Sequence, residues 1–196
     1  MKRTNNNNWI FTISIILTAI VLAFLSFIPI NMEYIKPFVV YFDPTKLLSN
    51  LPLWIFINSI IALYSHSEKT SMLNTTLFNI ICFVSYCLFS KILTHAMPKE
   101  MFLTWIVFTL IWAIFAYLVW SANRKDTKGW ILSTILLAIL FSTCFTYTEN
   151  TISSTTILNF LLYVFLVVIL YKGTKETLII VVLSILLAMI LNKFQI

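Results

Sequence analysis

The residues of this chain best suited to chemistry form a polar stripe within one apolar segment. Thr75, Asn79, Cys82, Tyr86 and Ser90 recur at spacings of four, three, four and four, which places them on one face of a helix. Hydroxyl, amide and thiol groups can hydrogen-bond to neighbouring helices or to a bound molecule. In lipid such a stripe must face protein or water. We therefore expect it to point inward, where it either joins helices or lines a cavity.

Aromatic residues form a second candidate set. Trp105, Thr109, Trp112 and Ala116 share one face of the segment 101–121. Flat rings with a few hydroxyls and amides suit a neutral, flat or apolar small molecule. The alternative is that these rings only pack the helices together. The predicted ligand pocket takes two residues from each set and two more from the segment 47–65. Its six residues are Trp54, Asn58, Asn79, Tyr86, Trp105 and Trp112.

Catalytic and metal-binding patterns have less support. Cys82 and His66 lie on neighbouring segments, so a Cys–His nucleophile is one alternative, and an intramembrane enzyme that uses Cys82 or Cys144 is the last of three functional hypotheses. His66 and His95 are separated by an apolar segment, so they cannot share a metal ion. We expect no enzyme activity, no cofactor and no metal site.

The charged residues show which elements must position these groups. All 13 Lys and Arg and all 7 Asp and Glu lie outside long apolar windows. A charge at the centre of a bilayer costs ~2.5–3.5 kcal/mol on insertion scales, so lipid enforces this segregation. The sequence therefore predicts an all-α, polytopic transmembrane bundle, and residues 1–196 form a single integral membrane domain. The predicted spans are 9–30, 47–65, 72–90, 101–121, 130–148, 153–171 and 177–195.

The second span leaves the number of crossings open between six and seven. A helix capped by Asp43 and Pro44 could kink at Pro52, or a helix could begin afresh near Asn50. A re-entrant segment would leave six true spans.

Orientation follows from the basic residues. Eight Lys and Arg fall on the connectors of the N-terminal side and five on the other side, with the strongest cluster at Arg124, Lys125 and Lys128. Basic residues favour the cytoplasmic side. We therefore expect a bacterial cytoplasmic-membrane protein whose N-terminus is cytoplasmic, and the net charge of +6 needs no nucleic-acid partner.

Several landmarks resemble a family of small, uncharacterised multi-pass membrane proteins from low-GC Gram-positive bacteria. The similarity covers roughly residues 45–145, and no activity carries over from that family. The landmarks are Leu51-Pro52-Leu53-Trp54, Ser65, Asn74, Phe78, Ser85-Tyr86, Pro98-Lys99, Trp105, Trp120 and Lys128-Gly129-Trp130.

A fainter likeness is to the S components of energy-coupling factor transporters, which bind a vitamin from outside. Small residues at four-residue spacing on their first helix contact a shared transmembrane subunit. Ala19 and Ala23 are similar to that pattern, whereas Ser26 comes one residue early and a seventh span departs from it.

Together these observations lead to a non-enzymatic membrane protein. The leading hypothesis is a small-molecule-binding or uptake accessory subunit for a neutral ligand, with a membrane protein partner supplying energy. The alternative is a structural or interaction protein, such as an immunity, assembly or scaffold factor, without a ligand. Under either hypothesis we expect the protein to contact the lipid bilayer and to bind either another membrane protein or further copies of the chain.

Overall fold

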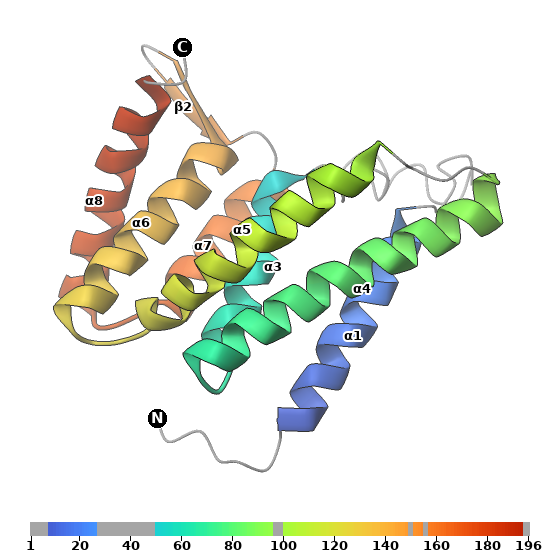
Figure 1. Ribbon diagram of the computed structural model, residues 1–196. Coiled ribbons are helices and arrows are strands. Elements are labelled where there is room, and N and C mark those ends of the chain that lie inside the picture. The colour runs from blue at the N-terminus through green and yellow to red at the C-terminus, as the bar shows by residue number, and fades with distance from the viewer. Residues whose placement is uncertain (1–7, 27–49, 96–99, 149–150, 155–156, 194–196) are drawn as a thin grey trace. The chain divides into compact units, whose positions relative to one another are not determined.

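The computed structural model describes residues 8–26, 50–95, 100–148, 151–154 and 157–193, which form apolar helices and one short antiparallel hairpin (Figure 1). The predicted helical fold class is confirmed in this coarse form. The elements are α1 (Asn8–Leu25), α3 (Leu51–Tyr64), α4 (Glu68–Thr94), α5 (Met101–Ala122), α6 (Thr127–Cys144), β1 (Phe145–Thr148), β2 (Thr151–Ser154), α7 (Ile157–Ile169) and α8 (Thr174–Lys193).

Helix length and composition identify a membrane protein. Four of the described helices, α4, α5, α6 and α8, are long and apolar enough to cross a bilayer. The helices α3 and α7 are also apolar but shorter, and so is the apolar stretch Ile10–Leu25 of α1. The 13 residues of α7 extend about 20 Å at 1.5 Å per residue, less than the ~30 Å of hydrocarbon in a bilayer.

Local capping explains why α4 begins four residues before the predicted span 72–90. The Ser67 side chain accepts a hydrogen bond from the Thr70 backbone N–H, and the Thr70 hydroxyl accepts one from the Ser67 N–H at 2.7 Å. This reciprocal pair satisfies two N–H groups that a helix start would otherwise leave free. The helix ends at His95, whose φ of 55° lies in the left-handed region that terminates helices.

The second predicted span begins afresh at Leu51, one of the two alternatives that the sequence allows. Pro52 lies in the first turn of α3, where its missing N–H costs no helical hydrogen bond. The proposed cap at residues 43–44 lies outside the described residues.

The hairpin corrects two predicted boundaries. The spans 130–148 and 153–171 were expected to be helical throughout, but α6 ends at Cys144 and β1 pairs with β2 in antiparallel register, Phe145 opposite Ser154 and Thr148 opposite Thr151. These strands are rich in Thr and aromatic residues, which favour extended backbone over helix. Hydropathy alone does not register that preference.

The described contacts divide the chain into two compact units, residues 1–50 with 64–117 and residues 51–63 with 118–196. In the first unit α1 packs along α4, and Ile15, Ala19 and Ala23 are buried. In the second unit α6 packs against α8 and α7 (Figure 1). There the Tyr163 hydroxyl lies 3.3 Å from the Ser184 hydroxyl and joins α7 to α8. Whether residues 1–196 act as one domain stays a prediction.

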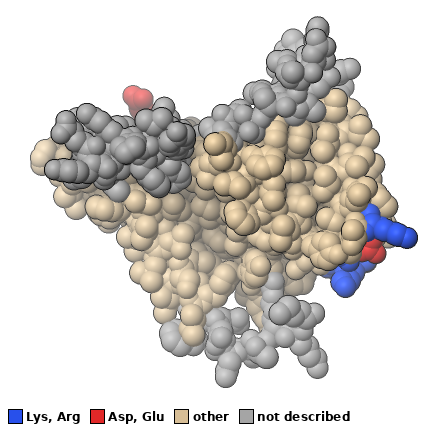
Figure 2. All heavy atoms as spheres, turned by 180° about the vertical axis from the view of Figure 1, so that it is seen from behind, with Lys and Arg blue, Asp and Glu red and all other residues tan. Residues whose placement is uncertain are grey.

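The charged side chains gather at helix ends. On the face drawn in Figure 2 the described surface is almost entirely uncharged, and the basic and acidic side chains that it shows lie at its margins. Large apolar side chains are exposed along the helices, for example Leu110 on α5 and Leu178 on α8. This division is what a bilayer requires of its solute.

Candidate functional site: a groove between two helices

The first unit contains a groove between α4 and α5 with a volume of about 330 Å³. We call it the α4–α5 groove. It lies within the range of about 300–1,000 Å³ that is typical of small-molecule sites. Its walls are Thr76, Ile80, Phe83 and Val84 from α4, and Trp105, Ile106, Thr109 and Leu110 from α5.

Residue size along the two helices explains the groove. At one end the Ser71 hydroxyl donates a 2.9 Å hydrogen bond to the Ala116 carbonyl, so the small side chains there let α4 and α5 approach closely. Further along, Phe83 stacks on Trp105 with ring centroids 5.4 Å apart and meets Phe102 edge-on at 5.0 Å. These bulky rings lie between the two helices, and two of them, Phe83 and Trp105, line the groove.

The groove is apolar and accessible from the bilayer side of the helices. Ile80 and Leu110 are 48% and 61% exposed, and Val84 and Ile106 are similar. Thr76 and Thr109 supply the hydroxyls, and no hydrogen bond to either is found among the described residues. The groove can therefore offer a flat ring surface and two hydrogen-bonding groups to a molecule that arrives through lipid.

The polar stripe of α4 lies on a different face of the helix from the groove. Thr75, Asn79 and Cys82 are fully buried, Ser90 is nearly so and Tyr86 is half-buried, which confirms that the stripe points inward. The Asn79 amide donates to the Thr75 carbonyl one turn earlier, at 3.0 Å. This bond remains within the helix, so the structure shows packing for the stripe and leaves the cavity alternative untested.

The six predicted pocket residues do not all meet in this groove. Trp105 lines it, whereas Trp112 is buried and contacts the rings of Phe108 and Phe115 along α5. Asn79 and Tyr86 belong to the buried stripe. Trp54 and Asn58 belong to the second unit, where both are buried and the Asn58 amide donates to the Trp54 carbonyl at 2.9 Å. The six-residue pocket as a whole stays a prediction.

Sequence reasoning did not select Phe83, the partner of Trp105. A signal was present, because Thr76, Ile80, Phe83 and Val84 follow helical spacing and carry an aromatic ring and a hydroxyl on one face. That face is as apolar as any lipid-facing surface. Only the position of α5 distinguishes this face of α4 from a surface that contacts lipid alone.

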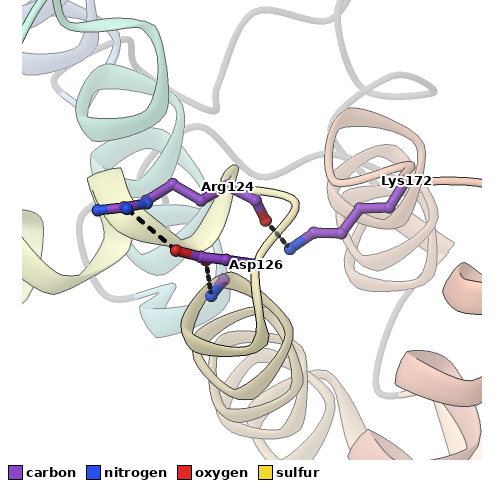
Figure 3. A network of polar contacts seen from close by, with 4 residues as sticks. Arg124, Asp126 and Lys172 are labelled. Atoms are coloured by element: carbon purple, nitrogen blue, oxygen red, sulfur yellow. Dashed lines mark hydrogen bonds and ion pairs between the residues drawn. The ribbon is translucent and has the colours of Figure 1, made fainter.

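A second polar arrangement lies at the loop between α5 and α6 (Figure 3). Asp126 caps α6 by accepting a 2.8 Å hydrogen bond from the Gly129 N–H, and its carboxylate lies 3.0 Å from Nη2 of Arg124. The Gly129 hydrogen bond and the nearby Arg124 and Lys128 lower the pKa of Asp126. Lys172, from the connection between α7 and α8, donates from Nζ to the Arg124 carbonyl at 2.6 Å. Burial lowers the pKa of Lys172 to about 8, against the opposing effect of Asp126 and Glu176.

No protein-family model, curated protein or solved structure matches this chain. The resemblances noted from the sequence therefore stay expectations. One detail bears on the likeness to transporter S components: Ala19 and Ala23 are fully buried in the unit where α1 packs along α4. Their side chains have no exposed surface for a separate subunit.

Proposed function

We propose that this is a non-enzymatic protein of a bacterial cytoplasmic membrane that binds a neutral, flat, apolar molecule in the α4–α5 groove. It has six or seven spans, and its N-terminus is cytoplasmic. The observation that carries the binding role is the stacked pair Phe83 and Trp105, which presents flat ring surface in a groove of ligand size. Stacking against aromatic rings contributes about 0.5–1.5 kcal/mol beyond area burial.

The ligand reaches the groove from the bilayer. The outer walls, Ile80, Val84, Ile106 and Leu110, are apolar and about half exposed, so a water-soluble molecule would gain nothing there. Thr76 and Thr109 would satisfy one or two polar groups of the ligand, such as ring carbonyls, because a hydroxyl both donates and accepts.

The location of two basic connections at the same end of the second unit supports the proposed orientation, with the N-terminus cytoplasmic. The hydrogen bond between Lys172 and Arg124 joins the α5–α6 and α7–α8 connections, so both lie at one end of the second unit. These two connections, together with the first turns of α6 and α8, carry five of the basic residues, and a cytoplasmic location agrees with the bias of such loops. An uptake role would need a partner to supply energy, and that partner must bind a surface other than Ala19 and Ala23.

A fluorescence titration tests the binding role. The probe is a lipophilic quinone with a short alkyl tail, because quinones quench nearby tryptophan emission. We expect quenching of the wild-type protein in detergent, and about tenfold weaker binding in Phe83→Leu, which removes the stacking partner but keeps Trp105 as reporter.

The matched control is Phe115→Leu. This change removes one ring from the same unit, and Phe115 contacts Trp112 outside the groove. Its affinity should equal that of the wild type. Equal affinities for all three proteins would overturn the proposal that the α4–α5 groove binds a ligand. That result would favour a structural or interaction protein without a ligand.

A further inference from the structure

A strongly basic surface lies at one end of the second unit and is separate from the groove. We call it the basic loop pair, because it combines the α5–α6 and α7–α8 connections and the first turns of α6 and α8. Two acidic side chains, Asp126 and Glu176, lie among the five basic ones and leave a net charge of +3. The basic residues are Arg124, Lys125, Lys128, Lys172 and Lys175.

The structure holds the two connections together from within. Lys172 is only 8% exposed, and its ammonium group donates to the Arg124 carbonyl at 2.6 Å (Figure 3). The Lys172 ammonium group therefore contacts the protein itself and is not counted among the groups that could bind an external anion. Lys125, Lys128 and Lys175 are exposed, and none forms an ion pair with any described residue. These three ammonium groups remain available to an external anion.

Helix polarity strengthens the positive potential. Lys128 and Lys175 lie in the first turns of α6 and α8, where the helix dipole is positive and a cation is disfavoured. Asp126, which caps α6, and Glu176, in the first turn of α8, offset this only in part, since five basic side chains lie around them. The cost of placing cations there is relieved when an anion binds between them.

An apolar surface continues directly from the basic loop pair. Ile131 lies one turn after Lys128 and is 55% exposed, and Leu178 lies three residues after Lys175 and is 63% exposed. Cationic groups next to exposed aliphatic side chains match the two halves of a phospholipid, a headgroup phosphate followed by acyl chains. A soluble anion would use the charges but not the apolar surface.

We propose that the basic loop pair binds the headgroup of an anionic glycerophospholipid, with Lys125, Lys128 and Lys175 contacting the phosphate and the acyl chains lying along Ile131 and Leu178. Basic clusters at the ends of membrane helices attract anionic lipid, and each Lys or Arg contributes about fivefold in affinity. The bound lipid would anchor this end of the bundle at the headgroup level. This site requires neither a ligand in the α4–α5 groove nor an uptake role.

The test is lipid binding measured by native mass spectrometry on the full chain in detergent. The probes are short-chain phosphatidylglycerol and short-chain phosphatidylcholine. We expect the wild type to prefer phosphatidylglycerol, and the double variant K125Q/K128Q to bind it about 25-fold more weakly while its weak binding of phosphatidylcholine is unchanged. Both positions are exposed, so the fold should tolerate the change.

The control variant K69Q/K91Q removes the same charge from exposed lysines of the first unit. Its preference for phosphatidylglycerol should match the wild type. An equal loss in both double variants would show that only net charge matters and would overturn the site. Full competition by millimolar inorganic phosphate would identify a phosphate site and overturn the lipid assignment. The assignment would also be overturned if K125Q/K128Q bound phosphatidylglycerol as the wild type does but no longer retained an acidic protein partner when purified from native membranes.

Discussion

The Lys172 ammonium group donates a hydrogen bond to the Arg124 carbonyl at 2.6 Å, across 48 residues of sequence. This single bond fixes two connections at one end of the second unit. The helices α6 and α7 lie between these connections in the sequence, so the chain must leave that end and return to it. The two basic connections therefore lie at the same end of this unit, as expected if the connections alternate between the two sides of a membrane.

Cysteine labelling should reproduce this alternation in the membrane. In a background with Cys82, Cys87 and Cys144 replaced by Ala, we expect Lys125→Cys and Lys175→Cys to react with a membrane-impermeant maleimide only after the cytoplasmic face is opened. Lys91→Cys, in the last turn of α4, is expected on the external side and should react in intact cells. Labelling of residues 125 and 175 from opposite faces would contradict the structure, whereas a common but external face would reverse only the proposed orientation.

Burial of Lys172 should make stability depend on pH. Its pKa falls from the ordinary 10.5 to about 8, so between these values the unfolded chain binds more protons than the folded one. Stability therefore rises as pH rises from 8 to 10.5, and the penalty of the buried charge is fully present below pH 8. Thermal unfolding in detergent should show the wild type gaining on Lys172→Met across that window. A constant difference between the two proteins would exclude this effect.

Gly129 should be intolerant of even one added carbon. A Cβ atom there would overlap the Arg124 carbonyl oxygen and lie 2.7 Å from the carbonyl carbon, and both are backbone atoms that cannot rotate away. Gly129→Ala should destabilise the protein by about 1–3 kcal/mol, the usual cost of overpacking. The comparison is Thr127→Ala, an exposed change in the same turn that should leave the melting temperature nearly unchanged. A stable Gly129→Ala would mean that the loop has a different path.

Much of the fold follows from the sequence because a bilayer imposes simple rules on length and charge. The predicted span 101–121 differs from α5 by one residue, and the capping sequence at Ser67 accounts for the earlier start of α4. The hairpin was missed for a physical reason. Its Thr and aromatic residues are apolar enough to continue a span, while their backbone preference favours strands.

The candidate site was harder to predict, because lipid and protein interior are equally apolar. Asn79 and Cys82 were correctly expected to face inward, since polar groups avoid lipid. Phe83 and Val84 carry no such mark. Their role in the groove depends on Trp105, which lies on another helix, and on the approach of Ser71 to Ala116, which no periodicity encodes.

The Ser71 hydroxyl is fully buried and donates to the Ala116 carbonyl at 2.9 Å, so it ties α4 to α5 at the narrow end of the groove. Ser71→Ala should cost about 0.6 kcal/mol, the mean for a hydrogen bond between membrane helices, measured by unfolding in detergent. Thr134→Ala is the control, because within the described part of the chain the Thr134 hydroxyl bonds only to the Trp130 carbonyl of its own helix. If the two helices are held at the proper spacing by this bond, Ser71→Ala should also weaken quinone binding in the groove while Thr134→Ala does not. A Ser71→Ala protein with wild-type stability and wild-type affinity would show that the aromatic contacts of Phe83 and Trp105 are sufficient to set the spacing.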